Sequence, residues 1–349
     1  MVFQGTFEKR CLTTGAPTEL SFLTTSLSML FILTNIPGNL LIILAVIIDP
    51  NKNLRSPFNW LMANLAMADL IVGIATDPMS AYFHMKEGLN LNISKEDVRA
   101  IHITYFISCT ASVLSLSTLA VERYLAIRKP HTYRNEFTTK RILLTVAWIW
   151  FISLSLPQVY FKVGYITYAF IFANTSIVLA IIITCFTYSL MLYKIKERSQ
   201  NLNQPPVVAS FTNISMEAST TITLSTLPPS PASSNSVIVN SARLMERKVT
   251  KMFIVVLIAL LCCYGPSTIM IYIMSFCESC SCVLLHWFRD LQFVFVIMNS
   301  SVNFYCYALR SSRFRSAFAK ILKINRSRQR ADFSNVQTER SGSRSAQLE

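Results

Sequence analysis

The chain has 349 residues, of which 52% are hydrophobic and 14% are charged, and its formal net charge is +14. This composition is too apolar for a typical soluble globular domain and too weakly charged for a disordered chain, which excludes both classes. It predicts a protein whose solvent is largely the lipid bilayer.

Seven apolar segments are long enough to cross a bilayer as helices, because a hydrocarbon core of about 30 Å requires about 20 helical residues. We expect these helices at residues 21–48, 57–85, 100–124, 141–161, 166–195, 244–276 and 285–309. Asp69 and Asp77 carry charge into the second segment. The predicted fold class is an all-α membrane protein, a seven-transmembrane helix bundle formed by one domain, residues 21–325.

The Lys and Arg residues indicate the orientation, because basic residues accumulate on the cytoplasmic side of membrane proteins. Most of the 32 Lys and Arg residues lie on that side if the N-terminal tail, residues 1–20, is extracellular. We therefore predict a multi-pass plasma-membrane protein whose C-terminal tail, residues 326–349, is cytoplasmic. Contact with anionic membrane lipids accounts for the net charge without a nucleic acid partner.

The connections between the predicted helices differ in length and composition. Residues 199–241 are rich in Ser, Thr, Asn and Pro, which predicts a disordered third intracellular loop, either a phosphorylation target or a plain solvated spacer. Apolar residues at three-to-four-residue spacing among basic ones predict an amphipathic helix at 312–324 on the inner leaflet. Asn92 begins an Asn-Ile-Ser motif in an outer loop and is our predicted glycosylation site.

Polar side chains recur inside the predicted helices, where a charged group at the helix centre costs roughly 2.5–3.5 kcal/mol. They are Asn39, Asp69, Ser112, Asn299 and Asn303. One interpretation is that they form hydrogen bonds that hold the helices together. The other is that the Asp69 carboxylate, surrounded by amide and hydroxyl oxygens, forms a site for a small cation.

Several motifs, in their joint order and spacing, resemble those of the rhodopsin-like (class A) G-protein-coupled receptors across nearly the whole chain. They are Gly38-Asn39, Leu65–Asp69, Glu122-Arg123-Tyr124, Trp148, Tyr188, Cys263–Pro266 and Asn303–Tyr307. Any one of them alone is a weak signal. Together they imply a receptor that binds an extracellular ligand and activates heterotrimeric G proteins, with arrestin and receptor kinases as further partners.

The resemblance also implies an inner switch. Arg123 matches the family arginine that pairs, in the inactive state, with its neighbouring acid, Glu122, and with an acid at the inner end of the sixth helix, Glu246. A ligand that favours an outward-moved sixth helix would break the contact between Arg123 and Glu246 and open a cleft for the G protein. The other positions that match the switch are Tyr124, Tyr188 and Tyr307.

An allosteric sodium ion is the one cofactor that the resemblance implies. The residues that match the family's sodium pocket are Asp69, Ser112, Asn299 and Asn303.

Three other positions depart from the family pattern. Tyr264 replaces the usual tryptophan, Ala180 the proline of the fifth helix, and Phe304 the proline of the Asn-Pro-x-x-Tyr motif. These departures leave open a seven-helix decoy that binds ligand without coupling to G proteins. A transporter is less well supported, because we find neither internal repeats nor interrupted helices in corresponding halves. We predict no enzymatic activity, because the sequence shows no intramembrane Ser–His pair, paired catalytic carboxylates or metal-ligand cluster.

The outer end resembles one branch of the family. Val98 stands where most members have the cysteine that bonds the third helix to the second outer loop, and the short loop Phe161–Tyr165 contains no cysteine. These features resemble the melanocortin receptors, in the branch that also holds cannabinoid and lysophospholipid receptors. This resemblance implies two disulfides, Cys11–Cys282 and Cys277–Cys280, although a free thiol is the alternative.

The expected ligand pocket lacks the charged residues of better-known relatives. Met79, Val98 and His102 stand where melanocortin receptors have three acids, and Tyr105 stands where amine receptors have an aspartate. We therefore expect a peptide or a neutral or lipid-like ligand in preference to an amine. The predicted pocket residues, which are otherwise plain packing aromatics, are His102, Tyr105, Tyr264 and Tyr272.

Overall fold

The computed structural model describes residues 6–11, 14–128, 133, 138–201, 255, 258–306 and 311–322. All regular structure in these ranges is helical. Seven helices are long and apolar enough to cross a membrane, so the predicted bundle is confirmed. The spans are Thr18–Ile48, Pro57–Gly88, Lys95–Ala126, Thr139–Val163, Tyr165–Lys194, Ile258–Phe276 and Cys282–Phe304.

Several spans are composed of more than one helical segment. The first, third and seventh spans are the single helices α2 (Thr18–Ile48), α5 (Lys95–Arg128) and α12 (Cys282–Phe304). The second consists of α3 (Pro57–Ile71), the π-helical η1 (Val72–Thr76) and α4 (Asp77–Gly88), and the fourth of α7 (Thr139–Ser155), the 3₁₀ segment η2 (Leu156–Val159) and α8 (Tyr160–Val163). The fifth consists of α9 (Tyr165–Phe172), the π-helical η3 (Ala173–Ile177) and α10 (Val178–Asn201). Two short helices, α1 (Thr6–Arg10) and α13 (Ser312–Ile321), lie outside the spans. In the segment predicted to be disordered, residues 199–201 continue α10, and the rest lies outside the described residues.

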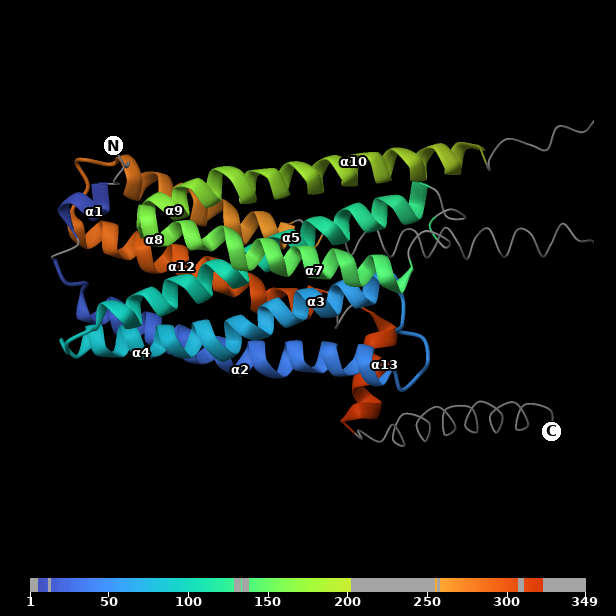
Figure 1. The fold of residues 1–349 in the computed structure, drawn as a ribbon, viewed down its shortest axis with the longest axis horizontal. Coiled ribbons are helices and arrows are strands. Elements are labelled where there is room, and N and C mark those ends of the chain that lie inside the picture. Colours follow the sequence, from blue (N-terminus) through green and yellow to red (C-terminus); the bar gives the residue numbers. More distant parts are fainter. Residues whose placement is uncertain are drawn as a thin grey trace, which may run out of the picture.

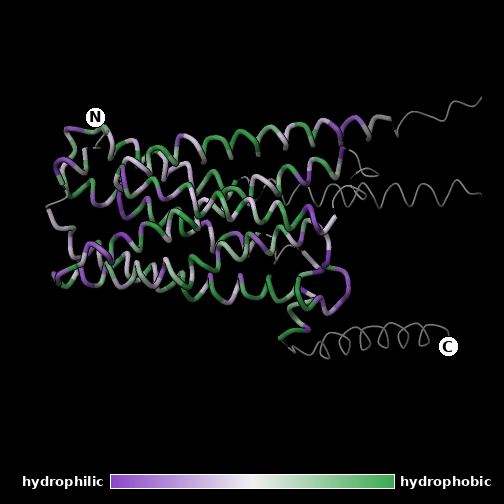
Figure 2. The backbone as a smooth tube through the Cα atoms, in the orientation of Figure 1, coloured by the Kyte–Doolittle hydropathy of each residue, from purple (hydrophilic) through white to green (hydrophobic). Residues whose placement is uncertain are grey.

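The two short helices lie at opposite ends of the bundle (Figure 1), and we name these ends the α1 end and the α13 end. Apolar residues dominate along the spans, while hydrophilic residues gather toward the two ends (Figure 2). This distribution is typical of a helix bundle whose middle faces lipid.

Serine caps fix where two of the spans begin. The Ser56 hydroxyl accepts a hydrogen bond from the backbone N–H of Asn59 at 3.3 Å, and Pro57 occupies the first turn of α3. The Ser281 hydroxyl accepts from the N–H of Leu284 at 3.3 Å, so α12 begins at Cys282. Residues 289 and 290 therefore lie about two turns inside the helix, which matters for the site below.

Phe304 joins three helices near the α13 end. A Cβ atom added to Gly38 in α2 would lie 2.8 Å from Cγ of Phe304, so the missing side chain makes room for this ring. The ring also stacks on Phe318 of α13, with centroids 6.1 Å apart. Phe314 and Phe318 are buried, whereas Arg313 and Arg315 are exposed, as expected of the predicted amphipathic helix. It ends at Ile321, and residues 323 and 324 lie outside the described residues.

We expect Gly38→Ala to lower the free energy of unfolding, because overpacking against the Phe304 ring costs about 1–3 kcal/mol. Alanine's better helix propensity recovers at most about 1 kcal/mol of this. Thermal unfolding of the purified protein measures the effect. The control is the same substitution in a Phe304→Ala background, where no ring remains. There it should be neutral or stabilising, and equal losses in both backgrounds would refute the packing explanation.

Candidate functional site

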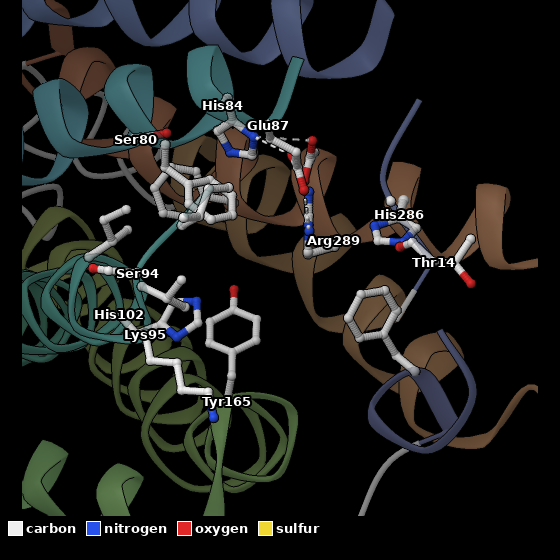
Figure 3. Close-up of a pocket in the computed structure, with 18 of the residues that line it drawn as sticks. Thr14, Ser80, His84, Glu87, Ser94, Lys95, His102, Tyr165, His286 and Arg289 are labelled. Carbon is white, nitrogen blue, oxygen red and sulfur yellow. Dashed lines mark hydrogen bonds and ion pairs between the residues drawn. The ribbon is translucent and has the colours of Figure 1, made fainter. Parts of the chain in front are cut away.

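A cavity of about 510 Å³ opens at the α1 end of the bundle. Its walls come from α1, α4, α5, α9 and α12, and from the connection between α4 and α5. Figure 3 shows that His84, Glu87 and Arg289 meet on one side, with His102 and Tyr165 side by side on another. The cavity therefore has an ionic wall and an aromatic wall.

The ionic wall is centred on Arg289 of α12. Its guanidinium donates to Glu87 of α4, with Nη2 at 3.1 Å from Oε1 and 2.9 Å from Oε2. Nε of the same side chain donates to Oδ1 of Asp290 at 2.7 Å. One cation thus lies between two carboxylates, and α4 and α12 are connected by charge-assisted hydrogen bonds.

His84 and two hydroxyls of α2 complete this group. Nδ1 of His84 lies 3.2 Å from Oε2 of Glu87 and 3.7 Å from Oδ2 of Asp290. The Ser21 hydroxyl donates to Oε2 of Glu87 at 3.1 Å, and the Thr24 hydroxyl donates to Oδ2 of Asp290 at 3.2 Å. We call His84, Glu87, Arg289 and Asp290 the ionic cluster.

The ionic cluster corrects two expectations drawn from the sequence. The second span continues past its predicted end at residue 85 to Gly88, so Glu87 lies within the helix, while Arg289 and Asp290 lie inside the seventh span as predicted. Glu87 and Asp290 therefore supply acids to a cavity that we expected to lack them. In addition, a group of possible metal ligands, His84, Glu87 and Asp290, does exist in the folded chain.

The aromatic wall lies where the family's usual disulfide is missing. The rings of His102 in α5 and Tyr165 in α9 are stacked with centroids 4.1 Å apart. Nδ1 of His102 lies 2.9 Å from the hydroxyl of Tyr160 in α8. Gly164 alone separates α8 from α9 and has a φ of 85°, a conformation that favours glycine. These contacts attach the fourth and fifth spans to α5 without a disulfide.

The four predicted pocket residues occupy different places. His102 lines the cavity. Tyr105 is buried away from the cavity lining and accepts a 2.7 Å hydrogen bond from Gln292, whose side-chain oxygen accepts one from Tyr165 at 3.0 Å. Tyr264 is also buried and does not line the cavity, and Tyr272 is partly exposed and donates to Asn174.

Two disulfides cross the α1 end. Cys11 is bonded to Cys282, and Cys277 is bonded to Cys280, which are the pairs that the resemblance implies. The first bond fixes α1 to the start of α12. Phe7 of α1 is buried, lines the cavity and contacts the His286 ring edge to face at 5.1 Å. The N-terminal segment therefore forms part of the cavity wall. Asn92, in the connection between α4 and α5, is exposed.

Asp69 occupies the middle of the bundle and is fully buried. Its carboxylate accepts hydrogen bonds from Ser112 of α5 at 3.3 Å and from Asn303 of α12 at 3.0 Å. Asn299, one turn before Asn303, is buried, and neither side-chain polar atom has a partner among the described residues. The side-chain oxygen of Asn39 is buried and unpartnered in the same sense. Unused carbonyl oxygens near a buried carboxylate fit a small, hard cation such as sodium.

A second buried carboxylate, Asp77, lies nearer the α1 end. Its Oδ2 accepts from the Asn35 amide at 2.9 Å, and the Asn35 oxygen in turn accepts from Ser301 at 2.9 Å. These bonds connect α2, α4 and α12. Asp69 connects its own span to α5 and α12, and Asp77 connects the same span to α2 and α12, which supports the interpretation that buried polar groups hold the bundle together.

Arg123 lies near the α13 end and contacts Glu122 and the Phe58 ring. Its Nε and Nη2 donate to Glu122 at 2.6 and 2.9 Å, and its guanidinium lies 3.8 Å from the centroid of the Phe58 ring. Tyr133 also donates a hydrogen bond to Glu122. Burial and the Glu122 carboxylate raise the pKa of the Tyr133 hydroxyl, which therefore stays protonated as a donor.

The remaining predicted switch residues are Tyr124, Tyr188, Glu246 and Tyr307. Tyr124 and Tyr188 are partly buried, and Arg128 lies over the Tyr124 ring at 5.9 Å. Glu246 and Tyr307 lie outside the described residues.

Comparison with known proteins gives a consistent result. Residues 38–307 match the family described as 7 transmembrane receptor (rhodopsin family). The chain is 32% identical to the muscarinic acetylcholine receptor gar-2 of Caenorhabditis elegans over 41% of its length, and 34% identical to dopamine receptor 4 of that organism over 36%. These matches span only 22% and 24% of those two receptors. The 5-hydroxytryptamine receptor 1B of Mus musculus is 27% identical over 78% of the chain and 80% of that receptor.

Proposed function

The chain belongs to the rhodopsin family of seven-transmembrane receptors, and we propose that it binds an extracellular ligand in the α1-end cavity and activates heterotrimeric G proteins. The proposal places the α1 end outside the cell and the α13 end in the cytoplasm of a plasma-membrane protein. The excess of basic residues on the α13 side supports this orientation.

The observation that carries the proposal is the arrangement of polar groups along the bundle. A ligand-sized cavity lies at one end, Asp69 connects three helices in the middle, and the Arg123–Glu122 pair lies at the other end. A receptor requires such parts, because a ligand must shift an equilibrium between two packings that differ at the far side. The intact Arg123–Glu122 pair favours coupling over a decoy function.

For the ligand, we propose a neutral molecule or a peptide without a free cation at its core. Both carboxylates that line the cavity, Glu87 and Asp290, already bind Arg289 and lie close to His84. The ammonium group of a ligand would therefore compete with Arg289 for these carboxylates. Tyr105 occupies the position where amine receptors have an aspartate. It is buried and accepts a hydrogen bond from Gln292.

An amine is the second candidate, because the relatives named above are amine receptors by name and because the ionic cluster has two carboxylates for one Arg. None of the relatives named above is a melanocortin receptor, so the proposed resemblance to that branch rests only on the missing disulfide and the cysteine pattern of the outer end. A reporter panel of cationic amines, neutral lipids and peptides separates the two candidates. If cationic amines alone activate the receptor, the first candidate, a neutral molecule or a peptide, is wrong.

We also propose that sodium binds beside Asp69 and favours the inactive state. The residues that would hold it are Asp69, Ser112, Asn299 and Asn303, which together supply carboxylate, hydroxyl and amide oxygens. We expect basal nucleotide exchange to be lower in NaCl than in KCl of equal ionic strength. Asp69→Asn should remove the difference, because it removes the anion. A sodium effect that persists in Asp69→Asn would place the ion elsewhere.

The direct test of coupling is nucleotide exchange on a panel of Gα subunits. We expect Glu246→Ala to raise basal exchange, because it removes the acid proposed to hold Arg123 in the inactive state. Glu217→Ala, which removes an acid from the segment 199–241, is the matched control. If Glu246→Ala leaves exchange at the wild-type rate on every subunit, the proposed lock is wrong.

A further inference from the structure

We propose that the ionic cluster is a binding site for a divalent transition-metal ion of the zinc class, in the wall of the outer cavity. Nδ1 of His84, a carboxylate oxygen of Glu87 and a carboxylate oxygen of Asp290 all lie within 4.8 Å of one another. Histidine nitrogens and Asp or Glu oxygens are common ligands of zinc in proteins. The site goes beyond the proposed function and does not depend on it.

The distances match those of a tetrahedral site. Zinc lies about 2.0–2.2 Å from such nitrogen and oxygen ligands, so two ligand atoms on one ion are about 3.3 Å apart. Nδ1 of His84 lies 3.2 Å from Oε2 of Glu87 and 3.7 Å from Oδ2 of Asp290. The three side chains therefore need only small movements to share one ion.

Arg289 and the α2 hydroxyls are compatible with a bound ion. Arg289 donates to Oε1 of Glu87 and to Oδ1 of Asp290, which are the carboxylate oxygens on the far side from His84. Binding requires it to give up only its contact to Oε2 of Glu87. Ser21 and Thr24 donate to the two oxygens that face His84 and orient the carboxylates. Ligating carboxylates are commonly held by such hydrogen bonds.

His286 supplies an independent observation. It is 3% exposed, lines the same cavity, and its Nδ1 has no partner among the described residues. Its Nε2 lies 2.7 Å from the backbone oxygen of Thr14, which only accepts, so Nε2 carries the proton and Nδ1 keeps its lone pair. Metal-binding histidines are typically held in this way. His286 precedes Asp290 by four residues, so both side chains lie on one face of α12. The group of ligand atoms within 4.8 Å of one another does not include His286, so this side chain has to move toward the ion to supply the fourth ligand.

The chain therefore presents two pairs of ligands on two neighbouring helices. His84 and Glu87 are three residues apart in α4, and His286 and Asp290 are four apart in α12. Such spacings place both members of a pair on the same helix face. A bound ion would join α4 to α12 beside the ligand cavity, and it would change the cavity's charge by two units.

The test uses the full-length protein without a polyhistidine tag, in detergent, and zinc ions alone as the probe. Equilibrium dialysis should give one saturable Zn²⁺ per chain at micromolar or lower concentration, with no comparable binding of Mg²⁺. His84→Ala and His286→Ala should each weaken binding at least tenfold. The control His131→Ala, which removes the histidine outside α4, α5 and α12, should bind as the wild type does.

A second measurement guards against variants that fail to fold. Zinc should raise the melting temperature of the wild-type protein, because binding stabilises the folded state, and should not raise that of His84→Gln. The proposal is overturned if the wild type binds no zinc in this range, or if either histidine variant binds as tightly as the wild type. Neither measurement involves a G protein, so failure here leaves the receptor function standing.

Discussion

Replacing Arg289 by alanine should lower the free energy of unfolding by about 3–5 kcal/mol, which is the usual cost of removing one partner of a buried ion pair. Glu87 and Asp290 would lose their shared cation while remaining between helices, and Asp290 is only 1% exposed. Thermal unfolding of the purified protein in detergent, at fixed pH and salt, measures the loss.

Two comparisons make this result specific. Arg99→Ala removes an arginine that pairs with Glu96 at 3.0 Å on the exposed start of α5, and it should cost less than about 1 kcal/mol. Adding Glu87→Gln to Arg289→Ala should restore part of the stability, because it removes one of the two uncompensated charges. If the two arginine variants unfold at the same temperature, the ionic cluster does not stabilise the bundle.

Glu122→Gln should raise basal nucleotide exchange on the coupled G protein about tenfold. Glutamine keeps the shape of Glu122 but loses the charge that holds Nε and Nη2 of Arg123 at 2.6 and 2.9 Å. Hydrogen bonds to charged groups contribute about 1.5–3 kcal/mol, and about 1.4 kcal/mol shifts an equilibrium tenfold. Arg123 would therefore be released more often for the G protein.

The measurement is GTP-analogue binding at matched receptor amounts. Asp97→Asn, at the opposite end of α5, is the control, since it removes an acid without touching Arg123. Exchange that stays at the wild-type rate in Glu122→Gln, on a subunit that the wild type activates, would show that Glu122 does not restrain Arg123.

The sequence predicted the bundle because a bilayer-length apolar segment is a local signal. It also predicted the depth of Asp69 and of Arg123, because both lie within long periodic helices whose register follows from 3.6 residues per turn. The contacts of Asp69 with Ser112 and Asn303 agree with the predicted grouping.

The ionic cluster was missed for a physical reason. Hydropathy ended the predicted second span at residue 85, before Glu87, whereas a helix continues as long as its backbone and caps allow, and paired charges are tolerated inside it. Glu87 and Arg289 neutralise each other across 202 positions of sequence, which no local pattern reveals. The available signal was the helical spacing of two pairs of residues, His84–Glu87 and His286–Asp290.

The predicted aromatic pocket residues show a second limit of prediction from the sequence. Tyr105, Tyr264 and Tyr272 are all tyrosines within predicted helices, so the sequence alone does not separate them. Which side of each helix faces a cavity depends on how the helices pack against one another. In the folded chain only His102, of the four, lines the cavity. Tyr105 instead holds Gln292 beneath it, a role that depends on contacts between α5 and α12.

The central claim, that this chain couples an outer cavity to G-protein activation through Arg123, is tested most directly by nucleotide exchange in lipid nanodiscs. Wild type, Glu122→Gln and Arg123→Ala should be compared on one panel of Gα subunits. We predict that Glu122→Gln accelerates exchange on at least one subunit, that the wild type does so more weakly, and that Arg123→Ala does not. If neither the wild type nor Glu122→Gln accelerates exchange on any subunit, or if Arg123→Ala matches the wild type, the claim is wrong.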